Sequence, residues 1–226
     1  MAERSRSVPE KTDVRAQLRA AILQGVYAPR QRLIEAELAE EYSASRFVLR
    51  NALIALAAEG LIELQPNRGA RVREISVPEA IEITEIRQAV EGLVAARAAG
   101  RASAENIVFL RALGQEMRDA VDQGELARYS DLNATLHGTL RVIADHASAT
   151  RILEQLNGQM VRHQFRLSMV PGRPSISLPE HLAIIDAVCD RDSEAARAAM
   201  MAHVGSVIAT LASLGADAPG RISTPR

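Results

Sequence analysis

The sequence predicts a mainly α-helical protein in two parts, a winged helix-turn-helix followed by an all-α helical bundle. Apolar residues recur at spacings of three and four from position 14 to position 59, and two short alternating runs follow. From position 78 onward the helical spacing continues and no strand pattern interrupts it. The expected boundaries are a mobile arm at 1–10, a winged domain at 11–75, a helical domain at 76–214 and a disordered tail at 215–226.

The composition is that of an ordinary globular protein. The 226 residues are 47% hydrophobic, no apolar run is long enough to cross a membrane, and the amino end has no signal-peptide core. We therefore expect a cytoplasmic protein with no membrane partner. The lone Cys189 cannot form an internal disulfide, and its apolar neighbours indicate a buried small side chain and not a nucleophile.

The charge is nearly balanced. A formal net charge of −1 argues weakly against nucleic-acid binding, since domains that bind nucleic acids are usually basic. Residues 1–75 carry 12 basic and 10 acidic side chains, so any contact with DNA would depend on where individual arginines lie. Two copies of the chain would double each such contact.

The first two helices of the winged domain are short. Val14, Leu18 and Ile22 form the apolar stripe of the first, and Gly25 ends it. Leu38 and Tyr42 line one side of the second, and only two residues separate that helix from the next, which is typical of a helix-turn-helix. The stretch between them, 27–32, is expected to be a loop. Arg30 and Arg32 in this loop could contact phosphate, although simple solvent exposure is favoured.

The third helix is expected at 45–59, with a Ser45 cap. One face is apolar, and the opposite face carries two arginines and an asparagine on its first turns. Reading of the DNA major groove requires such a face, because guanidinium groups bind guanine or phosphate and an amide binds adenine. A solvated polar face is the alternative. The apolar stripe is Val48, Leu49, Ala52, Leu53, Leu56 and Ala57, and the polar face is Arg46, Phe47, Arg50 and Asn51.

A hairpin completes the winged domain. The alternating runs 61–64 and 70–73 are separated by a turn at 65–69 that contains proline and glycine. Arg68 and Gly69 would then lie at the tip of the wing, where Arg68 could contact DNA.

Several motifs in this domain resemble the GntR family of bacterial transcription regulators. The matching strings are ILQG at 22–25, LIE at 33–35, SR at 45–46, RNAL at 50–53, AEGL at 58–61 and NRGA at 67–70. The resemblance implies binding to double-stranded operator DNA. The family usually has glycine in place of Arg30, Thr-Pro in place of Phe47-Val48 and glutamate in place of Asn51, so its usual operator cannot be assumed. The candidate DNA-binding residues are Arg32, Ser45, Arg46, Phe47, Arg50, Asn51, Arg68 and Gly69.

The second domain is expected to begin after a linker at 74–78. Its segments have helical spacing and stop at Gly100, Gly124, the junction at 145–146, the Pro-Gly-Arg-Pro loop at 171–174 and the turn at 190–192. Six helices in this length make an all-helical bundle. They are expected at 78–99, 104–123, 125–144, 147–169, 178–190 and 192–214.

Three histidines of this bundle lie on or beside apolar stripes. Asn133 and His137 are four residues apart, so their side chains reach the same spot, and His181 and His203 lie within the stripes of the last two helices. Three imidazoles and one amide could surround a divalent metal ion, with zinc or nickel favoured over magnesium or calcium. Taken singly, each histidine is more often a hydrogen-bonded core residue than a ligand.

The helical domain resembles the six-helix version of the FCD effector domain found in the FadR-like branch of the same family. The family has an acid or amide four residues before a histidine, a later Glu-His pair and a last histidine in the closing helix. Asn133 with His137, Glu180 with His181, and His203 match this pattern. Metal-binding members commonly have aspartate in place of Asn133, and a neutral amide would coordinate more weakly.

The resemblance also implies a small carboxylate effector. Arg87 and Glu91 match an arginine and a glutamate of the family's first effector-domain helix, and Arg87 could clamp an anion. An intrahelical ion pair between Arg87 and Glu91 is the equally weighted alternative. Arg162 and Arg166, one turn apart, are weaker candidates for the same pocket.

The leading hypothesis is a homodimeric, ligand-responsive, DNA-binding transcription regulator, with repression favoured, whose bundle binds a metal ion and a small organic acid. A metal-dependent hydrolase that uses the bundle histidines is one alternative. No His-Glu-x-x-His spacing is present to support it, and no catalytic residue is assigned. The other alternative is a regulator whose bundle only dimerises.

Overall fold

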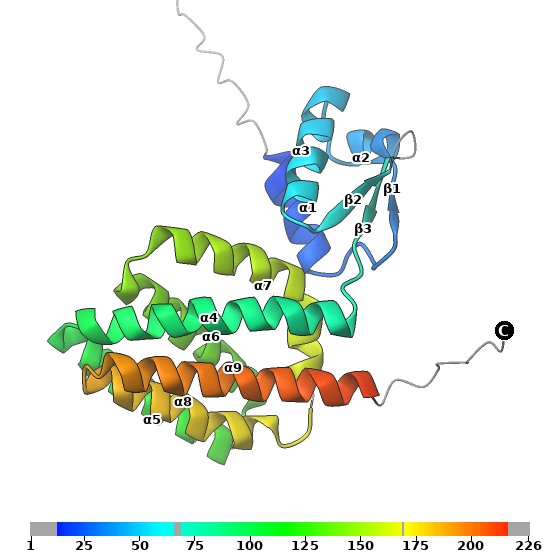
Figure 1. Ribbon diagram of the computed structural model, residues 1–226. Helices are drawn as coiled ribbons and strands as arrows, with labels where there is room; N and C mark the ends of the chain where they lie inside the picture. Colours follow the sequence, from blue (N-terminus) through cyan, green and yellow to red (C-terminus); the bar gives the residue numbers. More distant parts are fainter. Residues whose placement is uncertain (1–12, 66–68, 169, 217–226) are drawn as a thin grey trace, which may run out of the picture. The chain divides into compact units, whose positions relative to one another are not determined.

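The computed structural model describes residues 13–65, 69–168 and 170–216 (Figure 1). The chain divides into two compact units, Met1–Glu74 and Ile75–Arg226, and each is described by itself. The arm expected at 1–10 lies outside the described residues, as does the expected tail from 217 onward. Residues 215 and 216, which the sequence predicts to lie in that tail, are instead the end of a helix.

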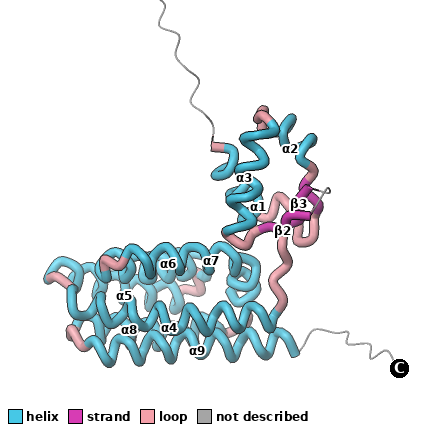
Figure 2. Tube along the Cα trace, turned by 45° about the horizontal axis from the view of Figure 1, so that its top comes forward, coloured by secondary structure: helices cyan, strands magenta, loops and turns pink. Residues whose placement is uncertain are grey.

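The first unit is a winged helix-turn-helix. Its helices are packed on a small antiparallel sheet in which the middle strand is the last in sequence, giving the order β1-β3-β2 (Figure 2). Leucines from all three helices share one buried core with residues of the sheet. The elements are α1 (Val14–Leu23), β1 (Arg32–Leu33), α2 (Glu35–Glu41), α3 (Arg46–Ala58), β2 (Ile62–Gln65) and β3 (Gly69–Val72).

The strand β1 corrects the expectation of a loop at 27–32. Arg32 pairs with Arg71 and Leu33 pairs with Ala70, so this two-residue strand forms the third strand of the wing sheet. A strand of two residues shows no alternating run, and its partner lies far along the sequence. Gly69 is required at this junction, because it has a φ of +80° and an added Cβ would lie 2.6 Å from the Leu33 carbonyl oxygen.

The buried stripe of α3 is narrower than expected. Leu49, Ala52, Leu53 and Leu56 are buried, as predicted. Val48 was assigned to the same stripe, but its side chain is 43% exposed. Successive residues of an α-helix are rotated by about 100° around its axis. Val48 directly precedes Leu49, so it lies at the edge of the buried stripe.

The second unit is a helical bundle. α8 begins at Arg173 and not at 178, because Pro174 occupies the first turn, where a missing backbone N–H costs nothing, and Pro179 lies inside the helix. This extra turn brings Arg173 and Ser177 onto a helix. The helices are α4 (Val77–Arg101), α5 (Ala104–Asp122), α6 (Leu126–Ala144), α7 (Ala147–Ser168), α8 (Arg173–Cys189) and α9 (Ser193–Ala216).

The helices α4 and α9 lie side by side and run in opposite directions (Figures 1 and 2). Small residues let them approach closely, since a Cβ added at Gly92 would lie 3.0 Å from the Met201 side chain. By length and composition alone α9 could span a membrane. One face of α9 packs along α4 and contributes Ala196, Met200 and Val204 to the bundle core.

Candidate functional site

The first candidate surface lies on α3. The hydroxyl of Ser45 caps this helix by accepting a hydrogen bond from the Val48 backbone N–H at 3.3 Å. The four side chains of α3 that were predicted to contact DNA are exposed, and that of Phe47 is 75% exposed although it is apolar. Such a face can offer guanidinium and amide groups to base edges and an aromatic ring to a thymine methyl group. The exposed residues are Arg46, Phe47, Arg50 and Asn51.

The wing sheet brings a further arginine to this unit's surface. Arg32 on β1 and Arg71 on β3 are directly opposed across the two strands, and both are exposed. Sequence reasoning named Arg32 and missed Arg71, because the pairing of β1 with β3 has no local signal. Gly69 is the first residue of β3, whereas Arg68 lies outside the described residues.

The second candidate site is a cavity of about 350 Å³ inside the helical unit. One wall comes from α6, on which four lining residues follow one another at intervals of four. Residues at this interval share one face of a helix. The four are Tyr129, Asn133, His137 and Arg141.

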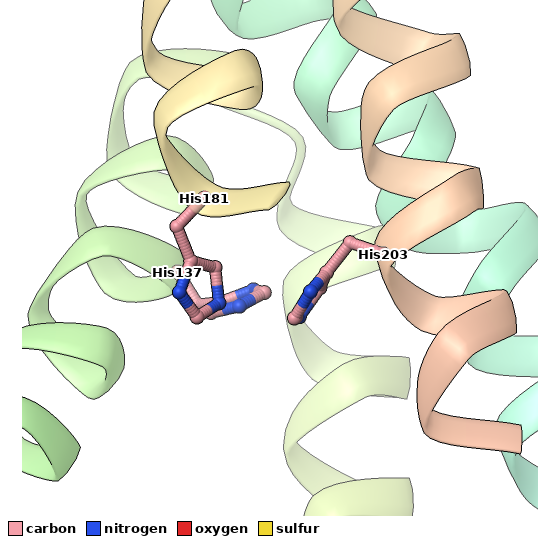
Figure 3. A group of neighbouring side chains, drawn as sticks. All are labelled: His137, His181 and His203. Atoms are coloured by element: carbon pink, nitrogen blue, oxygen red, sulfur yellow. The ribbon is translucent and has the colours of Figure 1, made fainter. Parts of the chain in front are cut away.

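Three histidines meet in this cavity. His137 extends from α6, His181 from α8 and His203 from α9, and their rings point toward one another (Figure 3). One potential ligand nitrogen of each ring lies within 4.8 Å of the other two. The apolar stripes of the three helices predicted this convergence. Three imidazoles this close together can share one divalent ion.

Carboxylates hold two of these imidazoles through Nδ1. The Nδ1 atom of His137 lies 2.9 Å from Oε2 of Glu91, and that of His203 lies 2.9 Å from Oε2 of Glu180. An ionised carboxylate can only accept a hydrogen bond, so both Nδ1 atoms donate, and in the neutral imidazole each Nε2 atom then keeps a lone pair. The same carboxylate-to-imidazole contact orients ligand histidines in metalloproteins.

A chain of hydroxyl groups holds His181 in the same way. Tyr129 Oη lies 2.8 Å from His181 Nδ1 and 2.8 Å from Ser177 Oγ. The Ser177 hydroxyl donates to the Pro174 carbonyl at 3.4 Å, so toward Tyr129 it accepts. Tyr129 then donates to Ser177 and accepts from Nδ1 of His181. The Nε2 atom of His181 is therefore also left with a lone pair.

Two buried atoms at the cavity have no partner within the described part of the chain. They are Nε2 of His181 and Oδ1 of Asn133. A buried polar atom without a hydrogen bond costs about 1–3 kcal/mol. Both atoms carry lone pairs, so one cation could satisfy both. The donor set of three imidazole nitrogens and an amide oxygen thus fits a divalent metal ion.

Burial keeps two of the imidazoles neutral, which is the form that binds metal. Desolvation lowers the pKa of His181 well below its ordinary value, and it lowers the pKa of His203 despite the opposing contact with Glu180. Burial alone would raise the pKa of Glu91. The charge of Arg87 and the hydrogen bond from His137 outweigh burial and hold the pKa of Glu91 below its ordinary value.

Arg87 and Glu91 form the intrahelical ion pair that was one of their two expected roles. Nε and Nη2 of Arg87 donate to Oε1 of Glu91 at 3.0 and 2.8 Å. Glu91 also contacts His137, so it supports a histidine of the cluster, while Arg87 still lines the cavity. The side chains of Arg162 and Arg166 lie outside the described residues.

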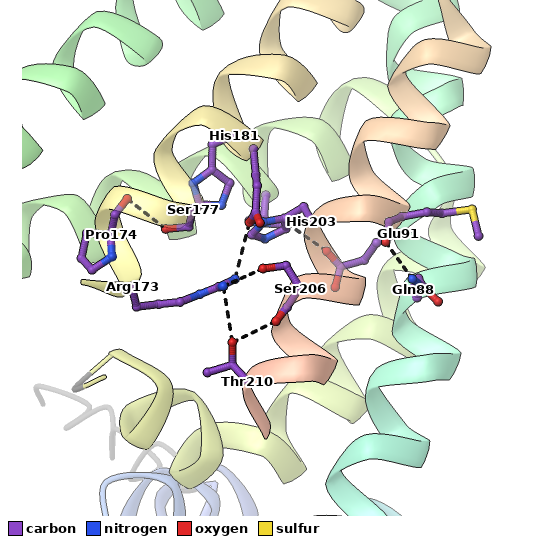
Figure 4. Close-up of polar contacts among 12 residues, drawn as sticks. Gln88, Glu91, Arg173, Pro174, Ser177, His181, His203, Ser206 and Thr210 are labelled. Atoms are coloured by element: carbon purple, nitrogen blue, oxygen red, sulfur yellow. Dashed lines mark hydrogen bonds and ion pairs between the residues drawn. The ribbon is translucent and has the colours of Figure 1, made fainter. Parts of the chain in front are cut away.

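Sequence reasoning gave no role at this site to three residues, and it placed Glu180 only in the Glu-His pair of the family pattern. Arg173, expected in a loop, is buried on the first turn of α8, where Nη1 donates to Ser206 Oγ at 2.7 Å and Nη2 to Glu180 Oε2 at 3.5 Å (Figure 4). The sequence places Tyr129 on the apolar stripe of the helix expected at 125–144 and gives it no further role. The spacing of four from Asn133 and His137 could have identified both Tyr129 and Arg141. The three residues are Tyr129, Arg141 and Arg173.

Both parts of the chain match described protein families. The family described as "Bacterial regulatory proteins, gntR family" matches residues 10–72, and the FCD domain matches residues 82–206. The chain is 32% identical over 190 residues to the HTH-type transcriptional repressor RspR of Escherichia coli, over 84% of this chain and 83% of that protein. It is 28% identical over 220 residues to an uncharacterized HTH-type transcriptional regulator of Streptomyces ambofaciens, over 95% of this chain and 90% of that protein.

Solved structures agree in fold. McbR/YncC of Escherichia coli superposes with a TM-score of 0.69 at 21% identity, over 89% of this chain and 96% of that chain. The family and the relatives are regulators and not enzymes, so the hydrolase alternative does not hold. The chain belongs to the GntR family of bacterial transcription regulators, carries an FCD domain, and is a DNA-binding transcription regulator.

Proposed function

We propose that this regulator binds one divalent metal ion in the cavity of its helical unit and that the ion, together with the cavity arginines, binds a small carboxylate effector. The observation that carries the proposal is the pair of unpartnered buried acceptors, Nε2 of His181 and Oδ1 of Asn133, beside two further imidazoles with free Nε2 lone pairs. A cavity without a ligand would leave both acceptors unsatisfied at a cost in stability.

The ligands would be His137, His181 and His203, with Asn133 as a weaker fourth. Three imidazoles favour zinc or nickel over magnesium or calcium, which prefer oxygen ligands. When bound, the ion would supply open coordination positions for a carboxylate group of the effector. Glu91, Tyr129 and Glu180 would orient the imidazoles, because each contacts an Nδ1 atom.

We propose that α3 reads the major groove of operator DNA. Arg46, Arg50 and Asn51 would bind base edges or phosphates, Phe47 would contact a thymine methyl group, and Arg32 would contact the backbone. Ser45, Arg68 and Gly69 complete the proposed DNA-binding set. The relative RspR is named a transcriptional repressor, which supports repression by this chain as well. DNA binding in a bacterium supports a cytoplasmic location.

We propose that the helical unit dimerises. The outer face of α9 carries exposed alanines at spacings of three, four and seven, and Ile86 on the adjacent α4 is 53% exposed. Small apolar side chains with this spacing allow two helices to approach closely. Two winged units could then bind the two half-sites of a pseudo-palindromic operator. The exposed alanines are Ala195, Ala198, Ala202, Ala209 and Ala212.

The test compares metal-loaded and metal-stripped protein. Protein purified without chelator or imidazole should contain zinc or nickel by elemental analysis, and removal of the ion should lower the melting temperature, because an ion bound only by the folded state stabilises it. Metal-loaded protein should bind a carboxylate such as citrate more tightly than stripped protein does. If metal-loaded and metal-stripped protein bind the carboxylate equally tightly, the histidines are core residues and not ligands. If the bundle binds neither metal nor carboxylate, it is a dimerisation module.

A further inference from the structure

Arg141 is a cavity arginine that a carboxylate held by the metal ion alone would leave without a partner. It lies on α6 four residues beyond His137 and eight beyond Asn133, and all three line the cavity. Its side chain is partly buried. Nη2 of Arg141 lies 3.8 Å from the point where a Cβ added at Gly138 would lie, so the guanidinium folds back along α6 by about one turn, toward Gly138.

The other two cavity arginines are engaged. Both Nε and Nη2 of Arg87 bond the buried carboxylate of Glu91. Arg173 donates to Ser206 and Glu180. Arg141 forms no hydrogen bond or ion pair with any residue whose side chain the structure describes. The carboxylate of Glu91 is already matched by Arg87 and His137, so the charge of Arg141 is not compensated within the lining.

We propose that Arg141 binds a second anionic group of the effector, which is therefore a small dicarboxylate. This inference rests on the proposed function, since the first carboxylate is assigned to the metal ion. A monocarboxylate that filled the cavity would displace water from Arg141 and leave its charge unpaired, whereas a second carboxylate would pair with it. A cavity of about 350 Å³ lies near the small end of ligand pockets, which favours a short diacid.

The test uses two pairs of ligands that differ by one charge. Succinate is compared with succinamate, and glutarate with glutaramate, by calorimetric titration of zinc-loaded protein. We expect at least one diacid to bind about 10- to 100-fold more tightly than its monoamide, as for a hydrogen bond between charged groups. Arg141→Gln should remove this preference and leave monoamide affinity unchanged, whereas Arg141→Lys should keep part of it.

Arg118→Gln is the matched control, because Arg118 is an exposed arginine of the same bundle outside the cavity lining. It should keep the full preference for the diacid. The zinc content of each variant is measured in parallel and should stay unchanged in Arg141→Gln. If the unmodified protein retains no zinc, that result counts against the proposed metal site. Each diacid is then compared with its monoamide on the zinc-free protein, so that the role of Arg141 is still tested. Equal binding of diacid and monoamide by the unmodified protein, absence of binding by either, or an equal loss of both in Arg141→Gln would overturn the inference.

Discussion

The exposed polar face of α3 and the cavity of the bundle both carry arginines and amides, but the two regions hold these side chains differently. On α3 these side chains are exposed above an apolar stripe that does the packing. In the cavity several polar groups are buried and bond one another: Glu91 bonds both Arg87 and His137. Function and stability should therefore be separable on α3 and coupled in the cavity.

The largest effect that would sharpen this contrast is expected at Glu91. Glu91→Gln removes the charge that pairs with Arg87. Both side chains are largely buried, with exposed fractions of 5% for Glu91 and 13% for Arg87. The substitution should therefore destabilise the bundle by about 3–5 kcal/mol. Chemical denaturation of the full chain measures this. The control is Arg101→Gln, which breaks the exposed pair with Asp145 and should cost no more than about 1 kcal/mol. Similar losses in both variants would remove the distinction between the two regions.

The next effect is expected on α3 and concerns affinity alone. Arg46→Ala or Arg50→Ala should each cost about 1–3 kcal/mol of operator affinity if the side chain binds a base. Their melting temperatures should match that of the unmodified protein, because both side chains are exposed and exposed substitutions change stability little. Operator titration and thermal melts measure both quantities. Unchanged affinity in both variants would contradict the assignment of this face.

A slightly smaller effect is expected at Tyr129. Tyr129→Phe keeps the ring but removes the hydroxyl between His181 and Ser177, so His181 loses the group that orients it. Loss of such a supporting contact should weaken zinc binding about 10- to 100-fold. Competition with a zinc chelator gives the affinity. The control is Tyr42→Phe, which removes a hydroxyl group from the winged unit and should leave zinc affinity unchanged. If Tyr129→Phe binds zinc as tightly as the unmodified protein does, the chain of hydrogen bonds does not support the site.

The smallest effect is expected in the loop before β1. Arg30 has a φ of 63°, in the left-handed region, where a side chain costs roughly 1 kcal/mol. Arg30→Gly should relieve this strain and lose only an exposed ion pair with Glu74, so the melting temperature should rise slightly. Gly25→Ala, at a φ of +80°, should have the opposite sign. A fall in both would mean that the ion pair outweighs the backbone strain.

Local periodicity was sufficient to predict the helices and the convergence of three histidines, because each histidine lies on or beside the apolar stripe of its own helix. It was insufficient for contacts between distant segments. β1 is two residues long and pairs with residues at 70 and 71. Tyr129 looked like one more apolar residue, since only the fold brings its hydroxyl to His181. Arg173 was assigned to a loop because the prolines beside it obscured the first turn of α8.

Zinc binding to metal-stripped protein tests most directly the proposal that the three histidines form one metal site. His203→Ala is compared with the unmodified protein and with His146→Asn, which alters a histidine outside the cluster and keeps a residue able to cap α7. We predict one tightly bound zinc ion per chain in the unmodified protein and in His146→Asn, and none in His203→Ala. Equally tight zinc binding by His203→Ala would contradict the proposal.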